Sequence, residues 1–183
     1  LIKQLKKYGN LTSEIETELN EKIKSLIKQK GDFLLKEGQI VSNLFVIEKG
    51  LVRSFYNINE SEINVWFGFE SGILGSVMPL FFSQPSIENI QFLEDTTLYY
   101  ISSNDLESFY KSSQEMNTIG RKMAEEYCKI LEERSFLLQT HTAEQRYHWL
   151  LKNQPEALQR ISLGHIASYL GISQETLSRI RKK

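Results

Sequence analysis

The spacing of apolar residues changes along the chain, and each spacing predicts a different kind of structure. Over residues 1–30, apolar positions recur every three or four residues, as expected for amphipathic helices. A first short helix ends at Gly9, and Thr12 or Ser13 can cap a second one. The apolar side of this second helix is expected to consist of Ile15, Leu19, Ile23, Leu26 and Ile27.

Between residues 31 and 103 the pattern becomes one of short runs rich in β-branched and aromatic residues. Glycines or acidic turns separate these runs, which cover residues 33–35, 44–47, 51–56, 63–69, 87–93 and 97–101. Many short strands at close spacing indicate an antiparallel barrel or sandwich. Its aromatic side chains are expected mainly in the core, with a small-ligand pocket as the alternative: Trp66, Phe67, Phe69, Phe81, Phe82, Tyr99 and Tyr100.

The helical spacing returns after residue 103, with a short helix over residues 105–110 and a long one over residues 115–139. In the long helix, apolar or small residues follow an a/d pattern for about three heptads, at Met116, Gly120, Met123, Tyr127, Ile130 and Leu137. Charged residues flank this narrow seam, which favours a two-helix coiled coil between two copies of the chain. Arg134 also falls on the seam and opposes a dry interface. Packing of the helix on its own barrel is the alternative.

Charge divides the chain into two parts, although the formal net charge of the whole chain is only −1. Residues 1–140 hold 15 Lys or Arg against 20 Asp or Glu, which gives −5, whereas residues 141–183 hold 7 against 3, which gives +4. This asymmetry favours a nucleic-acid partner at the C-terminal end.

The two ends of the chain also lead to expectations. The chain begins with Leu1 and stops directly after the basic run at residues 181–183, so we expect the natural protein to be longer. No apolar run reaches the roughly 18 residues that a membrane span needs, so no membrane partner is expected.

Residues 163–182, LGHIASYLGISQETLSRIRK, have the pattern of a helix-turn-helix. Ala167 lets the second helix approach closely, and Gly171 permits the positive φ of the turn. Ser173 can cap the second helix, whose outward side chains are expected to read DNA bases: Gln174, Glu175, Ser178 and Arg179. For the acid and the arginine of this set, a surface ion pair is the alternative. Contacts with phosphates are expected from Ser173, Arg181, Lys182 and Lys183.

The order of these parts resembles the Crp/Fnr family of bacterial transcription regulators. GISQETLSRIRK is similar to the family's recognition-helix signature, and FLLKEGQIVSNLFVIEKGLVR is similar to the opening of a cyclic-nucleotide-binding fold. The resemblance implies an α+β chain in three parts: N-terminal helices and an antiparallel β-roll or jelly-roll sensor domain (1–103), a dimerisation helix (104–140) and a winged-type helix-turn-helix (141–183). It also implies a cytoplasmic homodimer, not an enzyme, which binds double-stranded DNA at an inverted repeat and contacts RNA polymerase.

The stretch that matches the family's phosphate cassette departs from the nucleotide-binding pattern. In nucleotide-binding members, the acid of a Gly-Glu pair takes a ribose hydroxyl, and the arginine of a following Arg-Ser or Arg-Thr pair neutralises the cyclic phosphate. Here Gly75 is followed by Ser76 instead of the acid, and Ser86 and Ile87 replace the second pair. A buried phosphate without a cation is poorly compensated. We therefore expect a degenerate cassette and no cofactor, with neither cyclic AMP nor cyclic GMP bound.

The chain lacks the side chains that most other sensing chemistries need. Its histidines, His141, His148 and His165, all follow residue 140, so the barrel offers no imidazole to a metal or a haem. This argues against the cupin-like metalloenzyme, the rival class for a small β-barrel. Cys128 is the one cysteine and is expected to be a small apolar filler. The remaining alternative to a DNA-binding regulator is a small-ligand- or protein-binding β-roll module whose helix-turn-helix is structural only.

Overall fold

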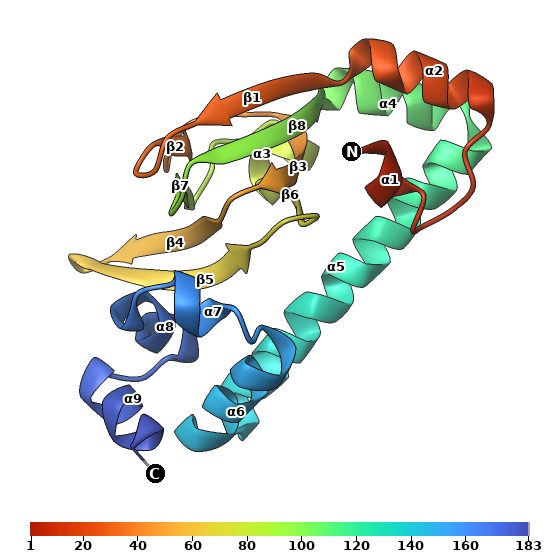
Figure 1. The fold of residues 1–183 in the computed structure, drawn as a ribbon. Coiled ribbons are helices and arrows are strands. Elements are labelled where there is room, and N and C mark those ends of the chain that lie inside the picture. The colour runs from red at the N-terminus through yellow and green to blue at the C-terminus, as the bar shows by residue number, and fades with distance from the viewer. Residues whose placement is uncertain (183) are drawn as a thin grey trace. The chain divides into compact units, whose positions relative to one another are not determined.

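The computed structural model describes residues 1–182, which divide into two compact units (Figure 1). The β-roll unit comprises residues 1–54 and 67–126, and the C-terminal unit comprises residues 55–66 and the chain from residue 127 onward. One hairpin and one long helix therefore contribute residues to both units. Within the described residues, no helix is both long and apolar enough to cross a membrane.

The N-terminal segment is helical only as far as residue 22. Helix α1 (Ile2–Leu5) is followed by α2 (Ser13–Lys22), and the Thr12 hydroxyl accepts a hydrogen bond from the Ile15 amide at 3.3 Å. Strand β1 (Lys24–Lys28) begins two residues after α2 ends. The predicted helix therefore stops early, because Leu26 pairs with Leu98 in an antiparallel ladder instead of completing a helical face.

Seven further strands and one short helix follow. They are β2 (Phe33–Leu35), β3 (Asn43–Lys49), β4 (Val52–Ile58), β5 (Ser61–Gly68), β6 (Ile73–Leu74), α3 (Val77–Phe82), β7 (Asn89–Phe92) and β8 (Thr96–Ser102). Two four-stranded sheets have the orders β1-β8-β3-β6 and β2-β7-β4-β5, and β3 pairs antiparallel with both β6 and β8. The prediction of an antiparallel β-roll is confirmed, although β1, β6 and α3 were not expected from the sequence.

Two tight turns depend on unusual backbone conformations. Strands β4 and β5 are joined at Asn59 and Glu60, which have φ values of 47° and 65°. Positive φ at both central residues is typical of the two-residue hairpin turn that matches the twist of paired strands. Gly50 has a φ of +110°, and a Cβ placed there would lie 2.8 Å from the Asp95 carbonyl oxygen, so this turn requires glycine.

The helical part of the chain begins with α4 (Ser103–Ser112) and α5 (Gln114–Thr140), close to the predicted ranges. Four shorter helices complete the C-terminal unit: α6 (Ala143–Asn153), α7 (Ala157–Arg160), α8 (Leu163–Leu170) and α9 (Gln174–Arg181). Helix α6 begins with a capping box in which Thr142 and Gln145 satisfy each other's backbone amides. The predicted boundaries between three parts, at residues 103 and 140, stay a prediction.

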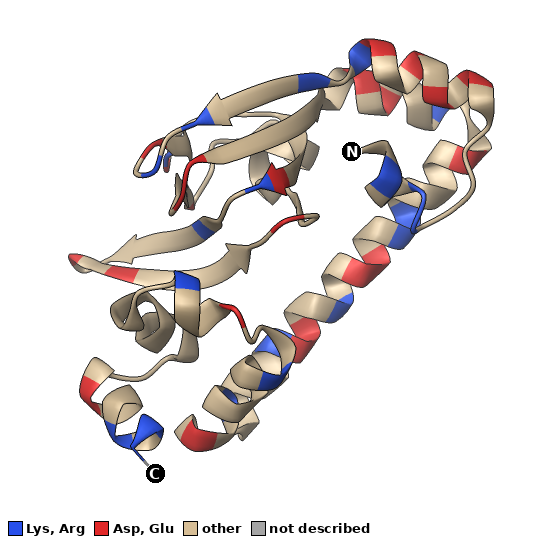
Figure 2. Cartoon of the chain, viewed as in Figure 1, with Lys and Arg blue, Asp and Glu red and all other residues tan. Residues whose placement is uncertain are grey.

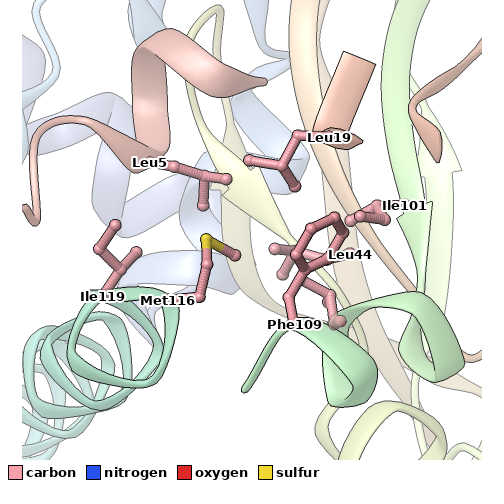
Figure 3. Packing of buried hydrophobic residues seen from close by; sticks show 8 residues of the cluster. Leu5, Leu19, Leu44, Ile101, Phe109, Met116 and Ile119 are labelled. Atoms are coloured by element: carbon pink, nitrogen blue, oxygen red, sulfur yellow. The ribbon is translucent and has the colours of Figure 1, made fainter. Parts of the chain in front are cut away.

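One core cluster joins the N-terminal helices to the β-roll. Side chains from α1, α2, β3, β8, α4 and the start of α5 meet there (Figure 3): Leu5, Leu19, Leu44, Ile101, Leu106, Phe109, Met116 and Ile119. Each is buried, and complete burial of such a side chain contributes about 1.5–3 kcal/mol. This cluster fixes α5 against the β-roll from its first turns.

The predicted aromatic core is correct only in part. Phe67 is buried, but Phe81 and Phe82 at the end of α3 are each 61 % exposed. The short helix α3 turns them outward, whereas a strand over the same residues would have placed one of the two in the core. The expectation that these two rings are core residues is therefore wrong.

Candidate nucleic-acid interface and effector cassette

Helices α8 and α9 are joined by a turn whose backbone hydrogen bonds leave little freedom. Gly171 has a φ of +64°, and its amide donates to the Ser168 carbonyl at 3.1 Å. The amide of Ile172 donates to the Ala167 carbonyl at 3.0 Å. This pair of bonds is the Schellman motif, which ends a helix and fixes the direction of the chain that follows. The predicted turn at Gly171 is confirmed.

The two helices pack through a small apolar core, as the sequence pattern predicts. Ile166, Ala167 and Leu170 of α8 are buried, and so is Leu177 of α9. The Ser173 hydroxyl accepts a hydrogen bond from the Thr176 amide at 3.2 Å and thereby caps α9. The expected phosphate contact of Ser173 would have to share this hydroxyl with the cap.

The four side chains that the sequence assigns to base readout all lie on the exposed face of α9: Gln174, Glu175, Ser178 and Arg179. Arg179 donates from Nη2 to the Thr176 hydroxyl at 3.2 Å, a partner one turn back along the helix. Glu175 has its pKa lowered by a hydrogen bond from its own backbone amide, by the Ser173 hydroxyl and, least, by Arg179. Glu175 therefore stays ionised at neutral pH and can accept hydrogen bonds.

Basic side chains follow this face at the end of α9. Arg181 and Lys182 are exposed, and Figure 2 shows Lys and Arg gathered at this end of the helix, opposite the acidic residue of its first turn. Lys183, the last residue expected to contact phosphate, lies outside the described residues. His165 is half-buried on α8, and His141 is half-buried and His148 exposed in the α6 region. In the part of the chain that the structure describes, no group of three potential metal ligands occurs.

The four residues at the cassette positions, Gly75, Ser76, Ser86 and Ile87, are called the cassette below. Ser76 and Ser86 are 3 % and 2 % exposed, and their hydroxyl oxygens lie 3.1 Å apart, within hydrogen-bonding distance. Ser86 also donates to the Glu88 carbonyl at 2.9 Å and accepts from the Glu88 amide at 3.1 Å. Ile87 is 60 % exposed and so lies outside this network.

The cassette is therefore satisfied within the chain. At the two positions that the sequence resemblance matches to an acid and an arginine, this chain has two buried hydroxyls that lie within hydrogen-bonding distance of each other. A Cβ placed on Gly75 would lie 3.1 Å from the Asn43 carbonyl oxygen, so the backbone here is closely packed as well.

Comparisons with known proteins show which families and structures the chain is similar to. Residues 28–113 match the family model of the cyclic nucleotide-binding domain. No curated protein matches the chain. FixK2 from Bradyrhizobium japonicum is similar in structure with a TM-score of 0.76 and 17 % identity, over 87 % of this chain and 83 % of that one. The catabolite activator protein of Thermus thermophilus has a TM-score of 0.62 and 18 % identity, over 98 % and 85 % of the two chains.

A third solved structure carries the family in its description. It is a putative transcriptional regulator of the Crp/Fnr family from Eubacterium rectale, with a TM-score of 0.69 and 16 % identity over 94 % of this chain and 82 % of that one. The chain has the Crp/Fnr fold. The resemblance inferred from the sequence is thereby confirmed at the level of the fold, and the Eubacterium rectale protein is described as a transcriptional regulator.

The long helix of this Crp/Fnr fold places the predicted seam residues differently from the expectation. Met116 is fully buried in the core cluster, and Leu137 is 3 % exposed. A Cβ on Gly120 would lie 2.7 Å from the Tyr110 ring, and Met123 packs partly against the core cluster. Four of the six residues predicted for the seam therefore contact their own chain. The predicted seam is wrong at these four positions. Only two remain largely exposed, Tyr127 and Ile130, at 44 % and 46 %.

A neighbouring stripe of α5 is more exposed. It consists of exposed residues with spacings of four, three, four and three: Ala124, Cys128, Leu131, Ser135 and Leu138. This spacing is also a heptad seam, displaced around the helix from the predicted one. We call it the α5 stripe. Cys128 is exposed on it, so its expected role as a core filler is wrong.

Arg134 does not oppose an interface, because it is turned toward α8. Its guanidinium lies over the Tyr169 ring, 3.9 Å from the ring centroid, and Nη2 donates to the Tyr169 carbonyl. Burial lowers the pKa of Arg134 and raises that of Tyr169. The sequence signal was available, since Arg134 was the one charged residue in the predicted seam.

Two further polar residues were not singled out from the sequence. Arg53 on β4 is 4 % exposed and donates from Nε and Nη2 to the Gln91 side-chain oxygen at 3.0 and 2.6 Å. Next to it, the Ser54 hydroxyl donates to the Glu88 carboxylate. A charged residue inside an apolar strand was the only available signal for Arg53.

Proposed function

We propose that the chain is a sequence-specific DNA-binding transcription regulator of Crp/Fnr type, with α8 and α9 as its helix-turn-helix. One observation carries the proposal: a fixed turn presents four exposed polar side chains on a single face of α9, with basic residues directly after them. Such a helix fits the major groove, where base edges carry a distinct pattern of donors and acceptors.

The roles of the side chains follow from their chemistry. Arg179 can donate two parallel hydrogen bonds to O6 and N7 of guanine, and the ionised Glu175 can accept from N4 of cytosine. Gln174 and Ser178 lie beside them and can contact neighbouring bases. Arg181, Lys182 and Lys183 are assigned to phosphates, which position the protein without specifying sequence.

A second copy of the chain is the proposed occupant of the α5 stripe. A continuous heptad seam on a long helix is typical of a parallel two-stranded coiled coil, and two of its five residues are leucines that are 51 % and 38 % exposed, Leu131 and Leu138. In a two-fold dimer, the recognition helices enter successive major grooves about 34 Å apart. The preferred DNA site is therefore an inverted repeat. Contact of the bound dimer with RNA polymerase stays a prediction.

No cyclic AMP or cyclic GMP is bound in this proposal. The cassette supplies neither an acid for the ribose nor a cation for the phosphate, and its two buried hydroxyls already bond to each other. Calorimetric titration is expected to show no binding of either nucleotide. A stoichiometric isotherm with micromolar affinity would contradict this part of the proposal.

Selection of bound duplexes from a random DNA pool tests the function. The proposal predicts a two-fold symmetric consensus whose half-sites lie one helical turn apart. A pool that gains no consensus would contradict it and would favour the alternative function, a ligand- or protein-binding β-roll module.

A further inference from the structure

We infer that Ser168 is a positioning residue for DNA binding, since it sets the orientation of α8 and, through it, of the recognition face of α9. This inference rests on the proposed function. Ser168 lies on α8 and joins two hydrogen bonds to the backbone of β5, more than a hundred residues earlier in the chain. Its hydroxyl donates to the Glu62 carbonyl at 2.8 Å and accepts from the Asn64 amide at 2.9 Å.

The two groups that Ser168 contacts belong to the outermost strand of a sheet. Strand β5 is the last strand in the order β2-β7-β4-β5, so one side of its backbone has no neighbouring strand. Residues 62 and 64 are two apart, and their backbone groups therefore point to the same side of the strand. One hydroxyl thus satisfies both a donor and an acceptor of that edge, which makes the contact sensitive to the helix position along the strand.

The tip of the hairpin that bears this edge belongs to the same unit as α8. It comprises residues 55–66 of the C-terminal unit, whereas Ser54 of β4 and Phe67 of β5 belong to the β-roll unit. Asn59 and Glu60 at this tip have the positive φ values of a two-residue hairpin turn.

A second contact holds the adjacent residue of α8. Arg134 of α5 binds the Tyr169 carbonyl and lies over its ring. Successive residues of a helix point about 100° apart, so Ser168 and Tyr169 are held from different sides. Together the two contacts fix the rotation of α8 about its own axis. Because the Schellman turn at Gly171 fixes the direction of α9 relative to α8, the orientation of α9 follows from that of α8.

Orientation matters because a dimer must place both recognition helices in successive grooves at once. If the contact of Ser168 is lost, the helices stay folded but sample more orientations, and the binding-competent fraction falls. The apparent affinity falls with that fraction, and the spacing between half-sites is read less strictly. A residue that only stabilises the fold would lower affinity without changing the preferred spacing.

The test compares the full chain with Ser168→Ala, Ser168→Thr and Ser61→Ala. Ser168→Thr keeps a hydroxyl on α8, and Ser61→Ala removes an exposed hydroxyl from the same hairpin as a matched control. Two quantities are measured: hydrogen exchange of the Asn64 amide, and binding to the selected inverted repeat and to versions with one base pair more or fewer between the half-sites.

We expect Ser168→Ala to speed exchange at Asn64, to weaken binding to the best duplex roughly tenfold, and to reduce discrimination between spacer lengths. Ser168→Thr and Ser61→Ala should behave like the wild type. An unchanged spacer preference of Ser168→Ala, whether its binding is weaker, equal or tighter, would overturn the positioning role alone. A wild-type chain that binds no duplex specifically would overturn the proposed function, and the positioning role with it.

Discussion

The cassette and the exposed face of α9 differ in where their polar side chains find partners. In the cassette, Ser76 and Ser86 are almost completely buried and bond to each other and to Glu88. On α9, the polar groups of Gln174, Glu175 and Ser178 face solvent. Because a buried hydrogen bond must be broken before a ligand can use its groups, only the α9 face is ready to bind without rearrangement.

The comparison shows that a chain can retain a fold without retaining the side chains that bind a ligand in other members with that fold. Residues 28–113 match the cyclic nucleotide-binding domain model, and the β-roll is complete. Its two sheets need apolar strand residues and a few turn glycines, and these are present. The ligand chemistry of nucleotide-binding members needs two charged side chains, and we propose that Ser76 and Ser86 stand at those positions here.

The largest effect is expected from disrupting the proposed dimer seam on α5, which would separate the two recognition helices. The double substitution Cys128→Asp with Leu131→Asp places four carboxylates in the dimer seam and should give monomers at micromolar concentration. Specific DNA affinity should fall more than about a hundredfold, because the second half-site is no longer bound intramolecularly. Sedimentation and binding isotherms measure both effects.

Lys122→Asp with Lys129→Asp is the matched control, since these residues are exposed on the opposite side of α5. It makes a larger change in charge but should leave a dimer. Cys128 also tests the register, because mild oxidation should link two copies of the wild type and not of Cys128→Ser. A wild type that sediments as a monomer would rule out the α5 stripe as a dimer seam.

Arg179→Ala is the next largest change and acts on the α9 face directly. It should cost about 1–3 kcal/mol on the preferred duplex and relax the choice of base at one symmetric position in each half-site. Lys182→Ala should instead weaken binding to all duplexes alike and flatten the salt dependence, because it removes a phosphate contact. If Arg179→Ala weakens matched and scrambled duplexes equally, Arg179 is a phosphate contact and not a base reader.

The α9 face was predictable because its signals are local. Gly171 and Ser173 specify a turn and a cap within a few residues, so the sequence pattern alone located the exposed side chains that are proposed to read DNA. The α5 stripe was not predictable, because Ala124, Cys128 and Ser135 are small or polar and a search for large apolar residues passes over them. Met116 and Leu137 gave the stronger pattern, but both side chains are buried within their own chain.

Long-range pairing explains the other differences. Ile23, Leu26 and Ile27 fit a helical face as well as a strand, and the ladder of β1 with β8 decides between the two. The contact of Ser168 joins residues more than a hundred positions apart, and a serine on a helix carries no local sign of such a partner. The contact of Arg53 with Gln91 was unpredictable for the same reason, because Gln91 comes from another strand.

A smaller effect is expected from the cassette. Ser86→Ala removes the partner of Ser76 and of the Glu88 amide and should lower the free energy of unfolding by about 1–3 kcal/mol. The preference for the selected duplex over a scrambled one should not change. Thermal unfolding measures the first effect, with the exposed Ser108→Ala as control. A loss of DNA specificity in Ser86→Ala at unchanged stability would show that the cassette still controls α9.

The smallest effect concerns pH and the β-roll unit alone. Burial, together with a hydrogen bond to Glu126 and its negative charge, raises the pKa of Tyr8 to about 12. A raised pKa means that the folded state favours the neutral phenol, so this contribution to stability is complete below about pH 10 and is lost as the pH rises toward 12. Tyr8→Phe should therefore lose less stability over this range. Ultraviolet titration of the phenols checks the pKa, and a value near 10 for Tyr8 would contradict the prediction.

Binding isotherms of the wild-type chain on the selected inverted repeat and on a scrambled duplex of equal length, at two salt concentrations, test the central claim most directly. If α9 reads sequence, the inverted repeat should bind at least about a thousandfold more tightly than the scrambled duplex, and the preference should persist at the higher salt. Equal affinity for the two duplexes, falling together as salt rises, would show binding to the phosphate backbone alone and would contradict the account.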